Sequence, residues 1–214
     1  MILVTGAAQG LGETIAIELA RSGHNLVIHH NKTDPERVLK ICRSFGVQAE
    51  SIQADLSDPT KFIEAYLHRF PETQGLVNNI GHWEEGDPQS CDSLALMKMN
   101  LHLPERLIGA LLPSIEKNRG HIVNIGTAGI EKPTLSCTAY AVSKAALWKY
   151  TLSLAKAVPR VKINMVSPGA LENTVGNPTD NLVALSEVAR LVAFLFSSEA
   201  ITGQNIEVAA GFLL

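Results

Sequence analysis

The chain has 214 residues, of which 46% are apolar and 18% are charged, a composition typical of one globular domain with a sizeable core. A net charge of −3 without any basic block argues against nucleic acid or an anionic membrane as a partner. Three scattered cysteines without a CxxC pair indicate reduced thiols. No apolar run could span a bilayer, and a first strand starting at residue 2 leaves no room for a signal peptide, so we expect a cytoplasmic protein.

The chain alternates between short apolar runs, which predict buried parallel strands, and segments with helical periodicity. The expected strands are residues 2–4, 25–30, 47–53, 75–79, 121–125, 161–166 and 205–208. The expected helices cover residues 13–21, 35–45, 59–70, 92–117 with a kink near Pro104, 138–158 and 186–197. This alternation predicts a single α/β domain over residues 1–214, a Rossmann fold whose doubly wound parallel sheet has about seven strands and helices on both faces.

A glycine-rich stretch, Thr5-Gly6-Ala7-Ala8-Gln9-Gly10-Leu11-Gly12, follows the first strand and opens the first helix. Glycine permits a tight turn and lets backbone N–H groups approach a diphosphate, which the positive end of the helix also attracts. An ordinary strand-to-helix turn is the alternative, so the interpretation depends on the motifs that follow.

Tyr140 and Lys144 lie four residues apart in an expected helix, and their side chains therefore share one face. A neighbouring ammonium favours the phenolate and lowers the phenol pKa from about 10, which makes the phenol a usable proton donor at neutral pH. The alternative is a tyrosine–lysine pair on a solvated helix face.

Together these motifs resemble the short-chain dehydrogenase/reductase family over nearly the whole chain, and its ketoacyl reductase-like and pteridine reductase-like members in particular. The matching motifs are Thr5-Gly6-x-x-x-Gly10-x-Gly12, Asp55-Leu56, Asn78-Asn79-Ile80-Gly81, Asn100, Tyr140-x-x-x-Lys144 and Pro168-Gly169, in family order. The resemblance implies that Tyr140 is the general acid, that Lys144 lowers its pKa and binds the nicotinamide ribose, and that Asn100 holds a water in a proton relay. A helix cap or kink is the alternative role of Asn100.

The resemblance also implies where a dinucleotide binds. Asp55 would accept a hydrogen bond from the adenine amino group with Leu56 packed nearby, although Asp55 also fits a turn before the next helix. The other implied cofactor residues are Gly6, Gln9, Gly10, Leu11 and Gly12 in the turn, and Asn79, Gly81, Pro168 and Gly169, with Asn78, toward the nicotinamide.

The chain departs from the family pattern where a serine usually precedes the tyrosine by thirteen residues. Thr127 stands there and keeps a hydroxyl, although its methyl group restricts χ1. Because the following loop reads one residue out of register, Gly126 and Ser136 remain alternative matches to this position.

The end of the second strand reads His29-His30-Asn31-Lys32 and has no acid to bind a ribose 2′-hydroxyl. We therefore expect NADP(H) as the preferred cofactor, with NAD(H) possible and with His30, Asn31 and Lys32 as donors. The two histidines also fit a role as simple strand-end residues.

Only about sixteen residues separate Gly169 from the last helix, so we expect a short loop at 173–180 and an open site in place of a helical lid. An outward apolar stripe on the helix at 138–158, including Ala145, Trp148, Leu152 and Leu154, predicts a homo-oligomer, a tetramer or a dimer.

We therefore expect an NADP(H)-dependent oxidoreductase that reduces a carbonyl or imine-like group of a small-molecule substrate. No cluster with metal-ligand spacing is evident. The alternatives are a cofactor-binding redox sensor or scaffold without turnover, and an epimerase or dehydratase that uses the same tyrosine and lysine.

Overall fold

The computed structural model describes residues 1–84, 91–132, 138–173 and 181–211. Its centre is a seven-stranded sheet in the order β3-β2-β1-β4-β5-β6-β7, in which all neighbouring strands are parallel. The strands are β1 (Ile2–Val4), β2 (Leu26–His30), β3 (Ala49–Gln53), β4 (Gly75–Asn78), β5 (His121–Ile125), β6 (Lys162–Pro168) and β7 (Asn205–Val208). The order reverses between β1 and β4, which is where a ligand crevice is expected in such a sheet.

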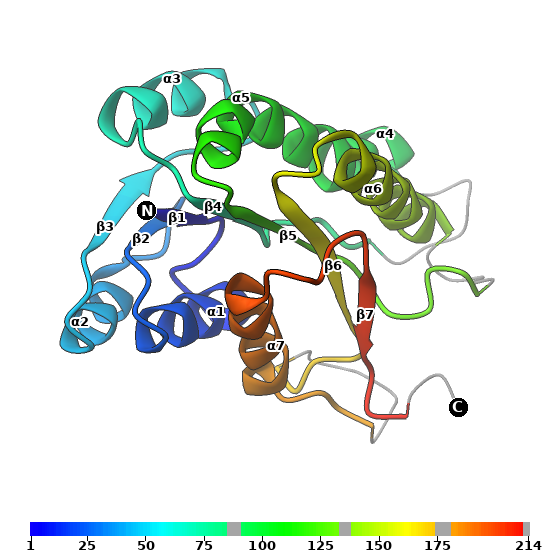
Figure 1. Ribbon diagram of the computed structural model, residues 1–214. Helices are drawn as coiled ribbons and strands as arrows, with labels where there is room; N and C mark the ends of the chain where they lie inside the picture. The colour runs from blue at the N-terminus through cyan, green and yellow to red at the C-terminus, as the bar shows by residue number, and fades with distance from the viewer. Residues whose placement is uncertain (85–90, 133–137, 174–180, 212–214) are drawn as a thin grey trace.

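Helices cover both faces of this sheet (Figure 1). One layer contains α1 (Gly10–Arg21), α2 (Glu36–Ser44) and α7 (Leu185–Ser197), and the other contains α3 (Thr60–Arg69), α4 (Ser93–Met97), α5 (Leu103–Lys117) and α6 (Thr138–Ala157). The doubly wound α/β fold expected from the sequence is confirmed.

The strands are apolar at consecutive positions because both faces of the sheet are covered. Ile2 and Val4 belong to the core under α1 and α7, whereas Leu3 belongs to the core under α3 and α5. Successive side chains point to opposite faces of a strand, so β1 needs an apolar residue at every position.

The expected kink near Pro104 is a π-helical stretch, Lys98–His102, that joins α4 to α5. Pro104 itself lies in the first turn of α5, directly after this stretch, and it has no N–H to donate to a carbonyl of the preceding turn. The irregularity therefore precedes the proline.

The outward stripe expected on α6 is narrower than the sequence indicates. Trp148 and Leu154 pack against the protein's own apolar clusters, whereas Leu152 is 38% exposed. Val142, which was not part of the expected stripe, is 56% exposed.

The expected short loop at 173–180 lies almost entirely outside the described residues. The backbone on either side of it is joined, because the Glu172 N–H donates to the Val183 carbonyl and the Val183 N–H donates to the Ala170 carbonyl. In the described part of the chain no helix is long and apolar enough to cross a membrane.

Candidate active site

The glycine-rich turn connects the end of β1 to the start of α1. Gly6 and Gly10 have φ angles of +63° and +59°, in the left-handed region that favours glycine. A Cβ atom on Gly12 would lie 2.4 Å from the Gly6 carbonyl oxygen, so a side chain there would push α1 away from the turn. The first N–H groups of α1 lack partners within the helix and carry its partial positive charge, which suits an anionic ligand.

Thr5 and Asn79 fasten this turn to the end of β4. The Thr5 hydroxyl oxygen accepts hydrogen bonds from the N–H groups of Asn79 and Ile80 at 2.9 and 3.1 Å. Asn79 Nδ2 donates to the Thr5 carbonyl at 2.9 Å. The two strand ends that flank the reversal in strand order are therefore held together by side chains.

Lys144 is buried within α6. Its Nζ donates to the carbonyl of Ile125, the last residue of β5, at 2.9 Å, and lies 5.9 Å from the centroid of the Tyr140 ring. Burial lowers the pKa of Lys144 to about 8 because the ammonium has lost its hydration. At pH 7 roughly nine-tenths of the side chain is still protonated, so a positive charge lies beside the Tyr140 ring.

Asn100 lies in the π-helical stretch and is fully buried. Its Oδ1 accepts the His82 N–H at 2.8 Å, and its Nδ2 donates to the His82 carbonyl at 2.8 Å and to the Ser143 hydroxyl at 2.9 Å. The Ser143 hydroxyl donates in turn to the Tyr140 carbonyl at 2.7 Å. Asn100 thus joins the segment after β4 to the second turn of α6, which is more than a cap or a kink requires.

Gly81 keeps the space between the lysine and the asparagine open. A Cβ atom at this position would lie 3.1 Å from both Lys144 Nζ and Asn100 Oδ1, closer than an ordinary contact. Asn78, just before it, donates through Nδ2 to Asn124 Oδ1 at 2.8 Å. This bond supports the expected role of Asn78 in steadying the central strands.

Thr127 lies two residues beyond β5 and is partly buried. The N–H of the next residue, Ala128, donates to the Pro168 carbonyl at 2.8 Å, which brings this segment next to Pro168-Gly169 at the end of β6. Gly126 has no hydroxyl group, and Ser136, the other alternative, lies outside the described residues. Thr127 is therefore the hydroxyl that the described structure places at the end of β5.

The loop after β2 contacts the glycine turn. The Thr33 hydroxyl donates to Gln9 Oε1 at 2.9 Å. Asn31 and Lys32 are exposed, and His30 Nδ1 is a buried atom with no hydrogen-bond partner among the described residues. Two of the candidate donors for a 2′-phosphate, Asn31 and Lys32, therefore lie in a loop that is tied to the turn, and the third, His30, ends β2.

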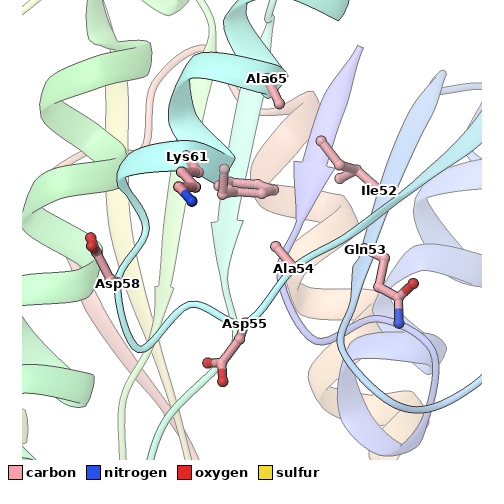
Figure 2. Close-up of a pocket in the computed structure, with 8 residues that line it drawn as sticks. Ile52, Gln53, Ala54, Asp55, Asp58, Lys61 and Ala65 are labelled. Carbon is pink, nitrogen blue, oxygen red and sulfur yellow. The ribbon is translucent and has the colours of Figure 1, made fainter.

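Asp55 and Leu56 follow β3. Asp55 Oδ1 accepts the Ser57 N–H at 2.8 Å, so the turn role is present, and hydrogen bonds from Ser57, followed by the charges of Lys32 and Lys98, lower the pKa of the exposed Asp55 carboxyl. A cavity of about 310 Å³ beside it is lined by the end of β3 and the first turns of α3 (Figure 2). Asp55 lines this cavity and the glycine-turn residues do not.

Two buried polar residues, His29 and Ser143, also contact this region. The sequence indicates for His29 only a place at the end of the second strand, and it does not single out Ser143. The His29 ring accepts the Gly6 N–H at 3.1 Å, and Ser143 joins Asn100 to Tyr140 as described above. The signal in the sequence that points to His29 is a polar residue directly after the apolar run of β2. No comparable signal marks Ser143.

Residues 1–181 match the family model described as short chain dehydrogenase. The chain belongs to the short-chain dehydrogenase family. It is 31% identical to an uncharacterized oxidoreductase, YmfI, of Bacillus subtilis (strain 168), over 98% of this chain and 97% of that protein. It is also 29% identical to the 3-oxoacyl-(acyl-carrier-protein) reductase FabG of Escherichia coli (strain K12), over 99% of this chain and 96% of that protein.

A blue fluorescent protein from a metagenomic library, solved in complex with NADPH, has the same fold as this short-chain dehydrogenase, with a TM-score of 0.88 at 28% identity over 100% of this chain and 97% of that chain. The family and its oxidoreductase members show that the protein is an enzyme.

The residues present fit the dinucleotide that the family implies. Among the described residues, a Cβ atom on Gly10 would meet only Asn173 Nδ2, at 3.5 Å, within 4 Å, so the described residues leave room for a ligand on the outer side of the turn. His30 Nδ1, which has no hydrogen-bond partner in the described part of the chain, lies at the end of β2. Among the described residues no group of three or more His, Cys, Asp or Glu side chains could hold a metal ion.

Proposed function

We propose that this enzyme reduces a carbonyl or imine-like group of a small molecule with NADPH, and that Tyr140 is the general acid. The observation that carries the proposal is the buried Lys144 ammonium beside the Tyr140 ring. Among the described residues no carboxylate forms an ion pair with this ammonium. A buried charge without a countercharge costs stability, and activation of Tyr140 is the reason to retain it.

When bound, the nicotinamide supplies hydride to the substrate carbon. The Tyr140 hydroxyl donates its proton to the substrate oxygen as negative charge develops there, and the Lys144 charge lowers the phenol pKa. The Thr127 hydroxyl donates a hydrogen bond to the same oxygen. Both Nδ2 hydrogens of Asn100 are already used, so a relay water would bind its main-chain carbonyl or the second lone pair of Oδ1.

We assign the diphosphate to the glycine turn, where Gly6 and Gly12 set the backbone for the α1 amides. NADPH is preferred over NADH, because no acid at the end of β2 opposes a 2′-phosphate and Lys32 is exposed. The NADPH complex of the similar structure and the reductase FabG support this choice. The other cofactor residues we propose are Gln9, Gly10, Leu11, His30, Asn31, Asp55, Leu56, Asn79, Gly81, Tyr140, Lys144, Pro168 and Gly169.

We also propose a cytoplasmic homo-oligomer, a tetramer or a dimer. The homo-oligomer is supported by two exposed apolar side chains on α6, Val142 and Leu152, which are 56% and 38% exposed.

Calorimetric titration with NADPH and NADH, followed by NADPH oxidation with aldehydes, ketones, 3-oxoacyl thioesters and pteridines, tests the function. Tyr140→Phe should bind NADPH as the wild type does and lose about 10²-fold or more in kcat, the scale of general acid catalysis. Near-full activity of this variant would remove Tyr140 from the role. Cofactor binding without turnover would indicate a sensor, and product formation without net NADPH consumption would indicate an epimerase or dehydratase.

A further inference from the structure

His29 is a buried polar residue that the proposed mechanism does not use. It is 1% exposed, and its Nδ1 accepts the Gly6 N–H at 3.1 Å. Its Nε2 lies 3.2 Å from the Ala54 carbonyl oxygen, and its own main-chain carbonyl accepts the Ala7 N–H at 2.9 Å. One residue therefore satisfies the two successive amides with which the glycine turn begins.

These contacts determine the protonation of the ring. A ring nitrogen that accepts a hydrogen bond from an amide N–H carries no proton. Nδ1 is therefore unprotonated, and Nε2 carries the hydrogen that it donates to the Ala54 carbonyl. Burial lowers the pKa of His29 to about 4. His30, on the same strand, is the titratable group that acts on it, while the Gly6 amide, the Ala54 carbonyl and the Phe62 ring, whose centroid is 5.3 Å away, do not titrate. The ring is neutral at pH 7.

We propose that His29 is a positioning residue for the cofactor, and that it fixes the glycine turn relative to the loop that begins at Asp55. The ring joins Gly6, in the turn, to Ala54, which directly precedes Asp55 and lines the cavity of Figure 2. Because His29 takes the Gly6 and Ala7 amides, the amides at the start of α1 remain as the donors for a diphosphate. The inference rests on the proposed function, which assigns this turn and Asp55 to the dinucleotide.

A histidine that merely fills the core and satisfies its own hydrogen bonds would contribute to stability and not to cofactor affinity. Replacing His29 by asparagine or by glutamine, whose side chains end in an amide, separates the contact with Gly6 from the contact with Ala54. In His29→Asn the amide oxygen takes the place of Nδ1 and keeps the Gly6 bond, whereas in His29→Gln the amide nitrogen takes the place of Nε2 and keeps the Ala54 bond. Val27→Ala is the matched control, because Val27 is a buried residue of the same strand that packs in the apolar core under α3 and α5.

The experiment measures the Kd of NADPH by calorimetry, kcat at saturating NADPH and thermal unfolding for all four proteins. His29→Gln should raise the Kd about tenfold or more, since a misplacement near 1 Å can cost up to about 10²-fold. His29→Asn, which breaks only the link to Ala54, should raise it by about threefold. Both variants should keep kcat within about twofold, because neither touches Tyr140 or Lys144, and Val27→Ala should leave the Kd unchanged at a similar loss of stability.

Unchanged NADPH affinity in His29→Gln, or an equal rise of the Kd in Val27→Ala, would overturn this inference and leave the proposed function standing. A wild-type protein that binds neither NADPH nor NADH would overturn the proposed function and the inference with it. The ¹⁵N spectrum of the unmodified protein adds a readout that needs no variant. It should show His29 as the Nε2–H tautomer at neutral pH, and the Nδ1–H tautomer would contradict the assignment.

Discussion

Replacing Lys144 by methionine should make the protein more stable and a poorer catalyst. The ammonium is buried and its pKa is lowered from 10.5 to about 8. A difference of one pKa unit corresponds to about 1.4 kcal/mol, so at neutral pH the buried charge destabilises the folded state by about 3 kcal/mol relative to the uncharged amine. Methionine has a similar length and no charge, and it removes this cost.

A part of the gain is offset because the Ile125 carbonyl loses the Lys144 hydrogen bond, at a cost of about 1–2 kcal/mol. The net expectation is a protein about 1–2 kcal/mol more stable at pH 7, which for a chain of this size raises Tm by about 2–8 °C. The folded-state pKa lies below the unfolded value, so the unfolded state binds more protons between pH 8 and 10.5 and wild-type stability rises with pH there. Lys144→Met lacks this rise.

Urea unfolding of the cofactor-free proteins at pH 7 and at pH 10 provides the assay. Lys149→Met is the control, because it makes the same change at an exposed position of α6 and should leave stability nearly unchanged. A Lys144→Met protein that is less stable than the wild type at pH 7, or that gains stability in parallel with it toward pH 10, would refute the reasoning. In the same variant kcat and NADPH affinity should both fall.

Three further predictions concern the turn and the end of β5. Thr127→Ser should remain active, whereas Thr127→Val should lose about 10²–10³-fold in kcat, as steady-state kinetics will show. Gly12→Ala would place a Cβ atom 2.4 Å from the Gly6 carbonyl oxygen and 2.6 Å from Asn79 Nδ2, and calorimetry should show NADPH affinity reduced tenfold or more. The neutral His29 ring, with a pKa lowered from 6.5 to about 4, stabilises the fold fully above pH 6.5, so urea unfolding should show that the wild type loses about 3 kcal/mol more than His29→Asn between pH 7 and pH 4.

The architecture could be predicted because it follows from local patterns. Apolar runs such as Ile2–Val4 and Gly75–Asn78 are strands because parallel strands are buried on both faces. The Tyr140 and Lys144 pair could also be predicted, because a separation of four residues in a helix sets their proximity whatever the rest of the fold does. The π-helical stretch at Lys98–His102 has no such local signature.

The sequence by itself therefore determined the alternation of strands and helices, the glycine turn and the helix face that carries Tyr140. Only the tertiary structure decided which polar groups share a hydrogen bond, because those partners are far apart in the chain. Gly6 meets His29 across 23 residues and Asn100 meets Ser143 across 43. The same holds for the charge of Lys144, whose pKa depends on how completely the sheet and helices exclude water from it, a property of the packed molecule and not of any segment.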